Sequence, residues 1–288
     1  MSNFRPGVVV LGAVAYAPKV ITIWEGFKEY FVKHDLPFDY ILYSNYETQV
    51  EALLAGHIDV AWNSPLAWIR TERLASAHGK KAHALAMRDA DCDLTSIILV
   101  KADSPVQTVA DLKGKTVAVG AVDSPQATLL PLEVIRSAGL EPGRDFTVQQ
   151  HNVLSGKHGD HVGGESDAVS ALWHDQADAA CILKANYPVF VQQGFVPADK
   201  LRVLAETPRF DHCNFTAIQD VTPLLARFRE LLLNMRFDDP KAHSFMEMEG
   251  VKRWLDGRTE GYRPLVSAVD HQHFYAPDGQ IAVKDYSY

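Results

Sequence analysis

Apolar and polar positions along the chain follow two periods in turn, and this alternation predicts strands and helices. Short aliphatic runs such as Val8–Leu11 are typical of buried strands, whereas Ile21–His34 carries apolar residues at helical spacing. The strands predicted in the first part of the chain are Val8–Leu11, Phe38–Tyr43, Ile58–Trp62, Ala82–Met87 and Leu94–Lys101. Because helical segments separate most of them, we expect an α/β fold with parallel sheets.

A strand followed by a well-capped helix stands near the centre of the chain. Thr116–Val119 is a short apolar run, rich in β-branched residues, of the kind found in buried parallel strands. Ser124 is a good N-cap, and Pro125 fits the first helical position. The free N–H groups of this helix start, with Ser124, Gln126 and Thr128, are therefore expected to bind an oxyanion. The alternative is a capped helix without a ligand.

Two parts of the chain match each other without a gap, which suggests two lobes of similar plan. Val50–Leu53 and Ile58–Trp62 correspond to Val169–Leu172 and Ala177–Cys181. In both, a helix ends in a turn, and an aspartate precedes the small residues of the next strand. Chance similarity between two common helix–turn–strand units is the alternative.

The length of 288 residues also favours two lobes over a single core. We expect lobe one to comprise residues 1–101 and 205–288, and lobe two to comprise residues 102–204. Lobes of this kind face each other across a central cleft, and ligands bind at the carboxyl ends of the strands.

Composition excludes several classes of partner. A net charge of −8 without a Lys/Arg cluster argues against nucleic acid as a partner. Three cysteines, widely separated, indicate no disulfide framework. Only Arg5 precedes the apolar run Val8–Ala15, which suits a first strand better than a secretory signal. We therefore expect a cytoplasmic protein, or a periplasmic one if a leader has been removed.

The loop before residue 165 carries the most unusual chemistry of the sequence. His158, Asp160 and His161 offer imidazole and carboxylate ligands of the kind that Zn²⁺ or Fe²⁺ takes. His158, His161 and Glu165 are also candidate catalytic residues, since histidine titrates near neutrality. The alternative is a hydrogen-bonding loop at the mouth of the cleft. No spacing in the sequence identifies a cofactor.

Three short stretches carry a resemblance to a known family. They are VAWNSP at 60–65, DSPQAT at 123–128 and GESDAV at 164–169. Together with Tyr46, they are similar to the substrate-binding proteins of phosphate, phosphite and phosphonate ABC transporters. The resemblance implies a type II periplasmic-binding-protein fold with two crossover strands. It also implies a small anionic ligand and the membrane subunits of a transporter as partners.

The resemblance also implies which residues touch the ligand. Tyr46 and the turn Asn63-Ser64 would be the contacts of the first lobe. Ser124, Gln126 and Thr128 would form the oxyanion cradle of the second lobe.

The sequence departs from the family at two places. Gly164 stands where aminoalkylphosphonate binders have a histidine before the helix glutamate. Beyond the last strand, Lys184 and Asn186 stand in the segment where those proteins place a carboxylate for the ligand's amine. Lys184 suits an anion, so these departures argue against an ammonium-bearing ligand.

Two functions follow from these observations. One is a binding protein that closes on a phosphonate-like, phosphate-like or carboxylate ligand. The other is a cytoplasmic enzyme on the same scaffold, with decarboxylase or lyase chemistry assisted by the His158–Glu165 loop. Fold alone does not decide between them.

Overall fold

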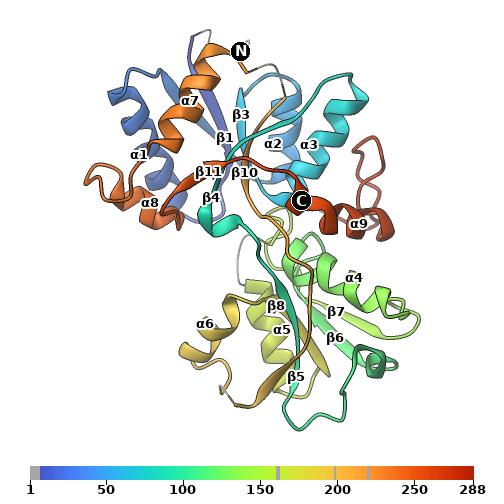
Figure 1. The fold of residues 1–288 in the computed structure, drawn as a ribbon. Coiled ribbons are helices and arrows are strands. Elements are labelled where there is room, and N and C mark those ends of the chain that lie inside the picture. The colour runs from blue at the N-terminus through green and yellow to red at the C-terminus, as the bar shows by residue number, and fades with distance from the viewer. Residues whose placement is uncertain (1–6, 160–162, 198, 219–220) are drawn as a thin grey trace. The chain divides into compact units, whose positions relative to one another are not determined.

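The computed structural model describes residues 7–159, 163–197, 199–218 and 221–288. The chain forms two compact units, each with its own β-sheet and helices (Figure 1). Unit 1 comprises Met1–Cys92, Asp211–Tyr262 and Tyr275–Ala282. Unit 2 comprises Asp93–Phe210, Arg263–Phe274 and Val283–Tyr288. The predicted α/β class is confirmed.

Unit 1 is built on a six-stranded sheet with the order β11-β4-β10-β3-β1-β2. Its strands are β1 (Val9–Val14), β2 (Phe38–Tyr43), β3 (Val60–Asn63), β4 (His83–Arg88), β10 (Asn214–Ala217) and β11 (Trp254–Asp256). β1 pairs in parallel with β2 and β3, whereas β10 runs antiparallel to β3 and β4. Its helices are α1 (Lys19–Lys33), α2 (Tyr46–Leu54), α3 (Pro65–Ala77), α7 (Pro223–Leu233) and α8 (His243–Glu249), with short 3₁₀ turns η1 (Asp89–Asp91) and η4 (Glu260–Tyr262).

Aromatic side chains make much of the core of unit 1. Phe27 of α1 lies between Phe245 and Trp254, with ring centroids 4.5 and 5.9 Å away. Every residue of β1 except Gly12 has a hydrophobic side chain, and all six positions are buried. The apolar run near the N-terminus is therefore a core strand, as the sequence predicts.

Unit 2 has a five-stranded sheet with the order β7-β6-β8-β5-β9. Its strands are β5 (Ser96–Lys101), β6 (Thr116–Val119), β7 (Thr147–Gln150), β8 (Ala179–Leu183) and β9 (Leu201–Glu206). β6 pairs in parallel with β7 and β8, whereas β5 is antiparallel to β8 and β9. Its helices are the π-helical turn η3 (Pro125–Leu129), α4 (Leu130–Ser137), α5 (Gly163–Trp173), α6 (Asn186–Gln192) and α9 (Arg263–His271), with a 3₁₀ turn η2 (Val109–Leu112).

The central strands of unit 2 bury both faces. Ala118 and Ala180 belong to the cluster that includes the α5 residues Ala168 and Leu172. Their neighbours Val117, Val119, Ala179 and Cys181 belong to the cluster that includes Leu132 and Ile135 of α4. This period-two division is what a strand buried on both sides requires. Cys181 thus packs as a small hydrophobe.

The bounds of the units differ from the expected divisions near 101 and 204. β5 belongs to unit 2 along its whole length, because Ser96–Leu99 pair with β8 and Ile97–Lys101 pair with β9. The sequence directly after Tyr262 forms α9, whose Leu265, Ala268 and Val269 are buried. In unit 2, α9 packs on α4.

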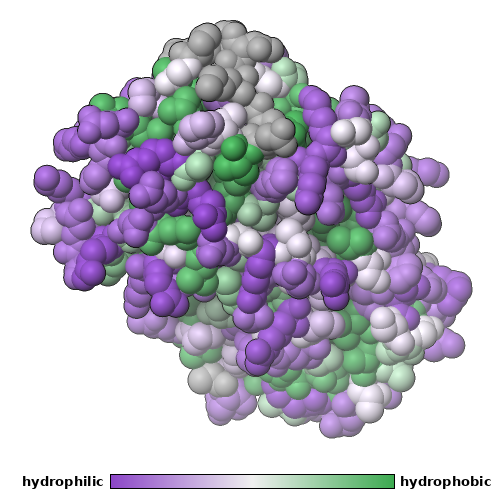
Figure 2. Space-filling model, turned by 45° about the horizontal axis from the view of Figure 1, so that its top comes forward, coloured by the Kyte–Doolittle hydropathy of each residue, from purple (hydrophilic) through white to green (hydrophobic). Residues whose placement is uncertain are grey.

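Hydrophilic residues cover much of the face shown in Figure 2, and hydrophobic residues lie between them in smaller groups. The large apolar side chains are mostly in the two cores. Among the described residues, no helix combines the length and apolar character needed to cross a membrane.

Candidate functional site

The start of the helix after β6 is the best-built candidate site of unit 2. Ser124 is the N-cap: its Oγ accepts the Ala127 N–H at 3.1 Å, and Pro125 occupies the first helical position. The predicted cap is confirmed. The first turn is wider than expected, because the N–H of Leu129 donates to the carbonyl of Ser124 at 3.0 Å. Such π-turns are frequent at functional sites.

Gly120 lets the end of β6 approach this helix closely. A Cβ at residue 120 would lie 2.8 Å from the Cβ of Ala127, which is too close for two carbon atoms. The Gly120 N–H donates to the Ala127 carbonyl at 3.1 Å and fixes the approach. A side chain at residue 120 would therefore push the helix start away from the strand.

The loop before α5 folds back onto the same helix start. Asp123 Oδ2 accepts the N–H groups of Gly156 at 2.6 Å and His158 at 3.2 Å. The side-chain amide of Gln126 donates to the Gly159 carbonyl. Gly159 has φ +67°, and a Cβ there would lie 2.7 Å from the Cβ of Ser124. Only glycine therefore allows this loop to lie against Ser124.

Three buried polar atoms around this loop have no hydrogen-bond partner among the residues that the structure describes. They are Asp123 Oδ1, Gln126 Oε1 and His151 Nε2. Leaving a buried polar atom unpaired costs about 1–3 kcal/mol, so such atoms are uncommon in folded proteins. Asp123 and Gln126 are 0% and 4% exposed, which places both acceptors inside the structure.

The two hydroxyls of the predicted cradle have different bonds. Ser124 Oγ accepts from Ala127, and a hydroxyl that accepts still has one proton to donate. The hydroxyl of Thr128 donates its proton to the Ala121 carbonyl at 2.7 Å. Thr128 can donate to a ligand only by giving up this bond, whereas Ser124 keeps its cap while donating.

Glu165 of α5 is buried, with 2% of its surface exposed. Its Oε2 accepts the Leu183 N–H at 2.9 Å and the Asn186 amide at 2.8 Å. Burial raises the pKa of Glu165 to about 7, although hydrogen bonds from Asn186, Leu183 and Gln126 oppose this shift. Glu165 therefore links α5 to the end of β8 and the start of α6.

Other predicted residues of this unit lie as follows. Lys184 pairs with Glu206 at 2.8 Å, and its side chain is 55% exposed. His158 is fully buried with φ +51°. Asp160 and His161 lie outside the described residues, so the metal site expected at His158, Asp160 and His161 stays a prediction.

Close packing of the backbone explains why residue 164 is a glycine. A Cβ at residue 164 would lie 2.7 Å from the His151 carbonyl oxygen and 3.3 Å from the Cα of Gly120. The backbone of the loop thus fills the space that a larger side chain needs. The departure from the family at this position follows from this close packing.

Unit 1 contains the same capped turn. Ser64 accepts the Ala67 N–H at 3.1 Å and is followed by Pro65, as Ser124 accepts from Ala127 and is followed by Pro125. Asn63 and Ser64 are fully buried, and Tyr46 is 2% exposed.

The side chain of Asn63 is held by two bonds. It accepts from Gln49 at 2.9 Å and donates to Thr71 at 3.1 Å. A ligand contact from this side chain would compete with these bonds.

Two partners of the helix start come from distant parts of the chain and were not predicted from the sequence. Asp123 accepts the hydroxyl of Tyr286 at 3.1 Å, and Leu129 accepts the side-chain amide of Gln272 at 2.8 Å. Both donors lie more than a hundred positions away along the chain, and no local pattern indicates such a contact.

Most of the chain matches one known protein family. The family described as the periplasmic substrate-binding protein of phosphonate ABC transporters matches residues 14–262. The chain belongs to this family. Membership agrees with the three sequence stretches that carried the resemblance.

Similar solved structures show that this member of the phosphonate-binding family has the type II periplasmic-binding-protein fold. PhnD1 from Prochlorococcus marinus, solved with methylphosphonate, is 17% identical with a TM-score of 0.69, covering 93% of this chain and 99% of its own. A Xanthomonas citri protein solved with ATP is 17% identical with a TM-score of 0.68, covering 92% and 96%.

A third similar structure comes from a phosphonate transporter. The binding-protein component from Pseudomonas aeruginosa is 13% identical with a TM-score of 0.62, covering 92% of this chain and 86% of its own. At these identities the likeness concerns the fold.

Proposed function

We propose that this protein binds a small phosphonate-like or phosphate-like oxyanion and that Ser124 is a direct contact. The observation that carries the proposal is the built helix start of unit 2, with Ser124 as its cap and the buried Gln126 beside it. A helix N-terminus presents N–H groups and a positive dipole end, which suit an anion. Family membership supports a ligand of this class.

The bound ligands of two relatives support the same class. PhnD1 from Prochlorococcus marinus was solved with methylphosphonate, and the Xanthomonas citri protein was solved with chloride and with ATP. All three are anions, and two of them carry phosphorus oxyanions.

The unpaired acceptors favour an oxyanion that carries a proton. Asp123 Oδ1 and Gln126 Oε1 can only accept hydrogen bonds. A phosphonate monoanion has a P–O–H group that can donate to such an acceptor, whereas a sulfonate has none near neutral pH. We therefore expect a phosphonate to bind more tightly than the sulfonate of the same size.

We infer a second set of contacts in unit 1, at the turn Asn63-Ser64 and at Tyr46. The support is the family resemblance and the capped turn that repeats the one at Ser124. Lys184 is a further candidate, provided that a ligand displaces its pairing with Glu206.

Family membership also supports an inference about the protein's partner and its cellular compartment. Its members are periplasmic substrate-binding proteins of ABC transporters. We infer that this chain delivers its ligand to transporter membrane subunits in the periplasm. Neither the family nor the similar structures support the cytoplasmic lyase alternative, so we do not propose it.

Isothermal titration calorimetry of the full chain tests this proposal. Methylphosphonate, inorganic phosphate and methanesulfonate are titrated separately at neutral pH. We expect saturable binding of at least one phosphorus oxyanion and weaker binding of methanesulfonate. Absence of binding for both phosphorus oxyanions would overturn the proposal, and preference for methanesulfonate would overturn the role of the acceptors.

A further inference from the structure

Three side chains of unit 1 with different ligand atoms come together away from the site described above. They are Asp91 of η1 and the neighbouring pair His212 and Cys213, which precede β10. One ligand atom from each lies within 4.8 Å of the other two, and all three residues are buried. None of them has a role in the proposed oxyanion site.

The three side chains are not arranged like a catalytic cysteine that a histidine activates. His212 Nδ1 lies 3.0 Å from Cys213 Sγ and 3.7 Å from Asp91 Oδ1. Thiol and carboxylate thus approach the same ring nitrogen. A Cys–His–Asp relay needs the carboxylate on the opposite nitrogen, so that the histidine can pass a proton between them. The three atoms instead converge on one region of space.

A thiolate, an imidazole and a carboxylate in this arrangement match a tetrahedral zinc site. Zinc–ligand distances of about 2.0–2.3 Å imply ligand–ligand separations of roughly 3.3–3.8 Å in a tetrahedron. The separations of 3.0 and 3.7 Å from His212 Nδ1 are close to this range. We propose that Asp91, His212 and Cys213 bind one Zn²⁺, with water completing the coordination. On binding, Cys213 releases its thiol proton to solvent.

Arg88 would support this site rather than occupy it. Its guanidinium donates to Asp91 Oδ2 at 2.6 Å and to Oδ1 at 2.8 Å. A carboxylate has about four lone-pair positions, so two remain for another partner. Hydrogen bonds from outside the coordination sphere commonly orient carboxylate ligands in metal sites.

The surrounding charges accommodate a dication. Arg88 and Arg258 face three carboxylates, those of Asp91, Asp211 and Glu249. A Zn²⁺ ion bound by a Cys213 thiolate adds one net positive charge. This charge would lie near the carboxylates of Asp91 and Glu249, which Arg88 also contacts.

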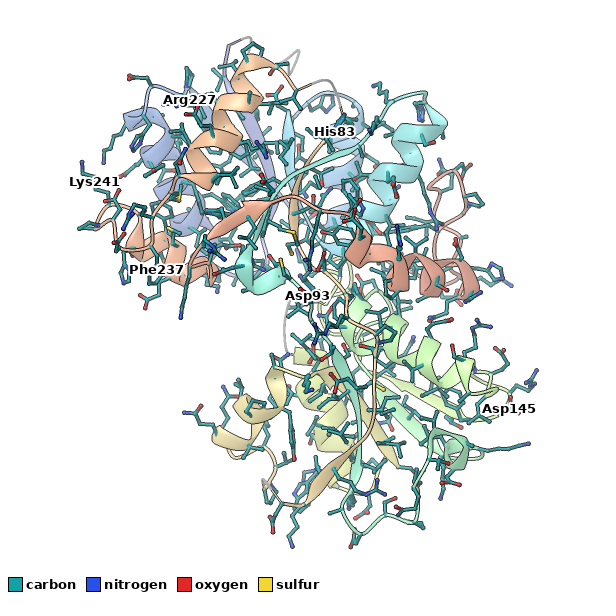
Figure 3. All side chains as sticks on the ribbon, viewed as in Figure 1. His83, Asp93, Asp145, Arg227, Phe237 and Lys241 are labelled. Atoms are coloured by element: carbon teal, nitrogen blue, oxygen red, sulfur yellow. The ribbon has the colours of Figure 1, made fainter. Side chains whose placement is uncertain are left out.

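The ligands flank two of the passages of the chain between the units. Asp91 is two residues before Asp93, the first residue of unit 2, which Figure 3 labels. His212 follows Asp211, where the chain returns to unit 1. A bound Zn²⁺ would therefore tie the two connecting segments together within unit 1. This stabilising role is independent of oxyanion binding.

Metal titration of the full chain tests the proposal. The protein is dialysed against a chelator and then given Zn²⁺ or Co²⁺, with stoichiometry from elemental analysis. We expect one ion per chain, a higher unfolding midpoint with Zn²⁺, and a Co²⁺ spectrum with a thiolate charge-transfer band. Cys213→Ser should abolish that band, and His212→Asn should weaken Zn²⁺ binding at least about tenfold.

Cys92→Ser is the matched control, because Cys92 lies beside Asp91 but outside the cluster. This variant should keep the stoichiometry and the cobalt spectrum. The proposal is overturned if the wild-type protein holds less than half an equivalent of ion or shows no thiolate band. A band that persists in Cys213→Ser, or that disappears in Cys92→Ser, also overturns it. Circular dichroism of each variant verifies its fold. If a variant does not fold, the stoichiometry and the cobalt spectrum of the wild-type protein decide the test.

Discussion

Two hydroxyls four positions apart on the same helix start differ in what they offer a ligand. Ser124 caps the helix and keeps its proton, whereas Thr128 gives its proton to Ala121. The sequence predicted the cap correctly, because cap residues act locally. It could not distinguish the two hydroxyls, since the Ala121 carbonyl becomes a partner of Thr128 only through the shape of the loop between them.

Glu165 gives a prediction of how stability depends on pH. Its pKa is raised to about 7 from 4.5 chiefly by burial, so the folded state binds a proton more tightly than the unfolded state does. Stability from this group is fully present below about pH 4.5 and is lost as pH rises through about 7. The loss amounts to roughly 3 kcal/mol, since one pKa unit is about 1.4 kcal/mol.

The variant Glu165→Gln should remove this pH dependence. Its amide oxygen can still accept from Leu183 and Asn186. Urea unfolding at pH 4.5 and 7.5 should therefore show the variant gaining stability relative to wild type as pH rises. Glu29→Gln, on the exposed side of α1, serves as the control. An unchanged difference between Glu165→Gln and wild type at the two pH values would contradict this prediction.

At the scale of elements, the strands and helices were predictable because each has its own hydrophobic period. β2 has the predicted bounds Phe38–Tyr43, and β6 has the predicted bounds Thr116–Val119. α9 was missed although Leu265, Ala268 and Val269 have helical spacing. The polar residues around them masked this pattern. The contact of the Gly156–Gly159 loop with Asp123 was not predictable, because it depends on tertiary structure.

The loop contact predicts an effect of Gly159→Ala. The new Cβ would lie 2.7 Å from the Cβ of Ser124, and the residue would keep a φ of +67°. Gly143→Ala is the matched control, since Gly143 has φ +75° with nothing within 4 Å of a new Cβ. Both variants should lose roughly 1 kcal/mol of stability from the left-handed backbone. Only Gly159→Ala should also weaken oxyanion binding, as measured by calorimetry. Equal affinities in the two variants would contradict the role of this loop.

At the scale of the whole molecule, the last residues of the chain return to both units. Arg70 donates to the Gly279 carbonyl at 3.3 Å in unit 1, and Tyr286 donates to Asp123 at 3.1 Å in unit 2. Composition and internal similarity indicated two α/β parts. The expected division placed residues 205–288 together in lobe one, and neither C-terminal segment repeats an earlier pattern that would assign it to one part.

The C-terminal contact predicts a cost for Tyr286→Phe. The variant removes one of the three donors named here for Asp123, so it should lower the free energy of unfolding by about 1 kcal/mol. Tyr288→Phe is the control, because Tyr288 is 50% exposed. Chemical denaturation of both variants provides the measurement. Equal stabilities would show that the Tyr286 bond does not help to hold Asp123.

The central claim is that Ser124 binds the oxyanion directly. Calorimetry with methylphosphonate should therefore compare wild type with Ser124→Ala and with Ser137→Ala, an exposed serine of α4. A hydrogen bond to a charged ligand is worth about 1.5–3 kcal/mol, so Ser124→Ala should weaken binding at least about tenfold. Thermal unfolding identifies the separate cost of the lost cap, about 1 kcal/mol. Ser137→Ala should bind as wild type does. Unchanged affinity in a folded Ser124→Ala variant would contradict the account.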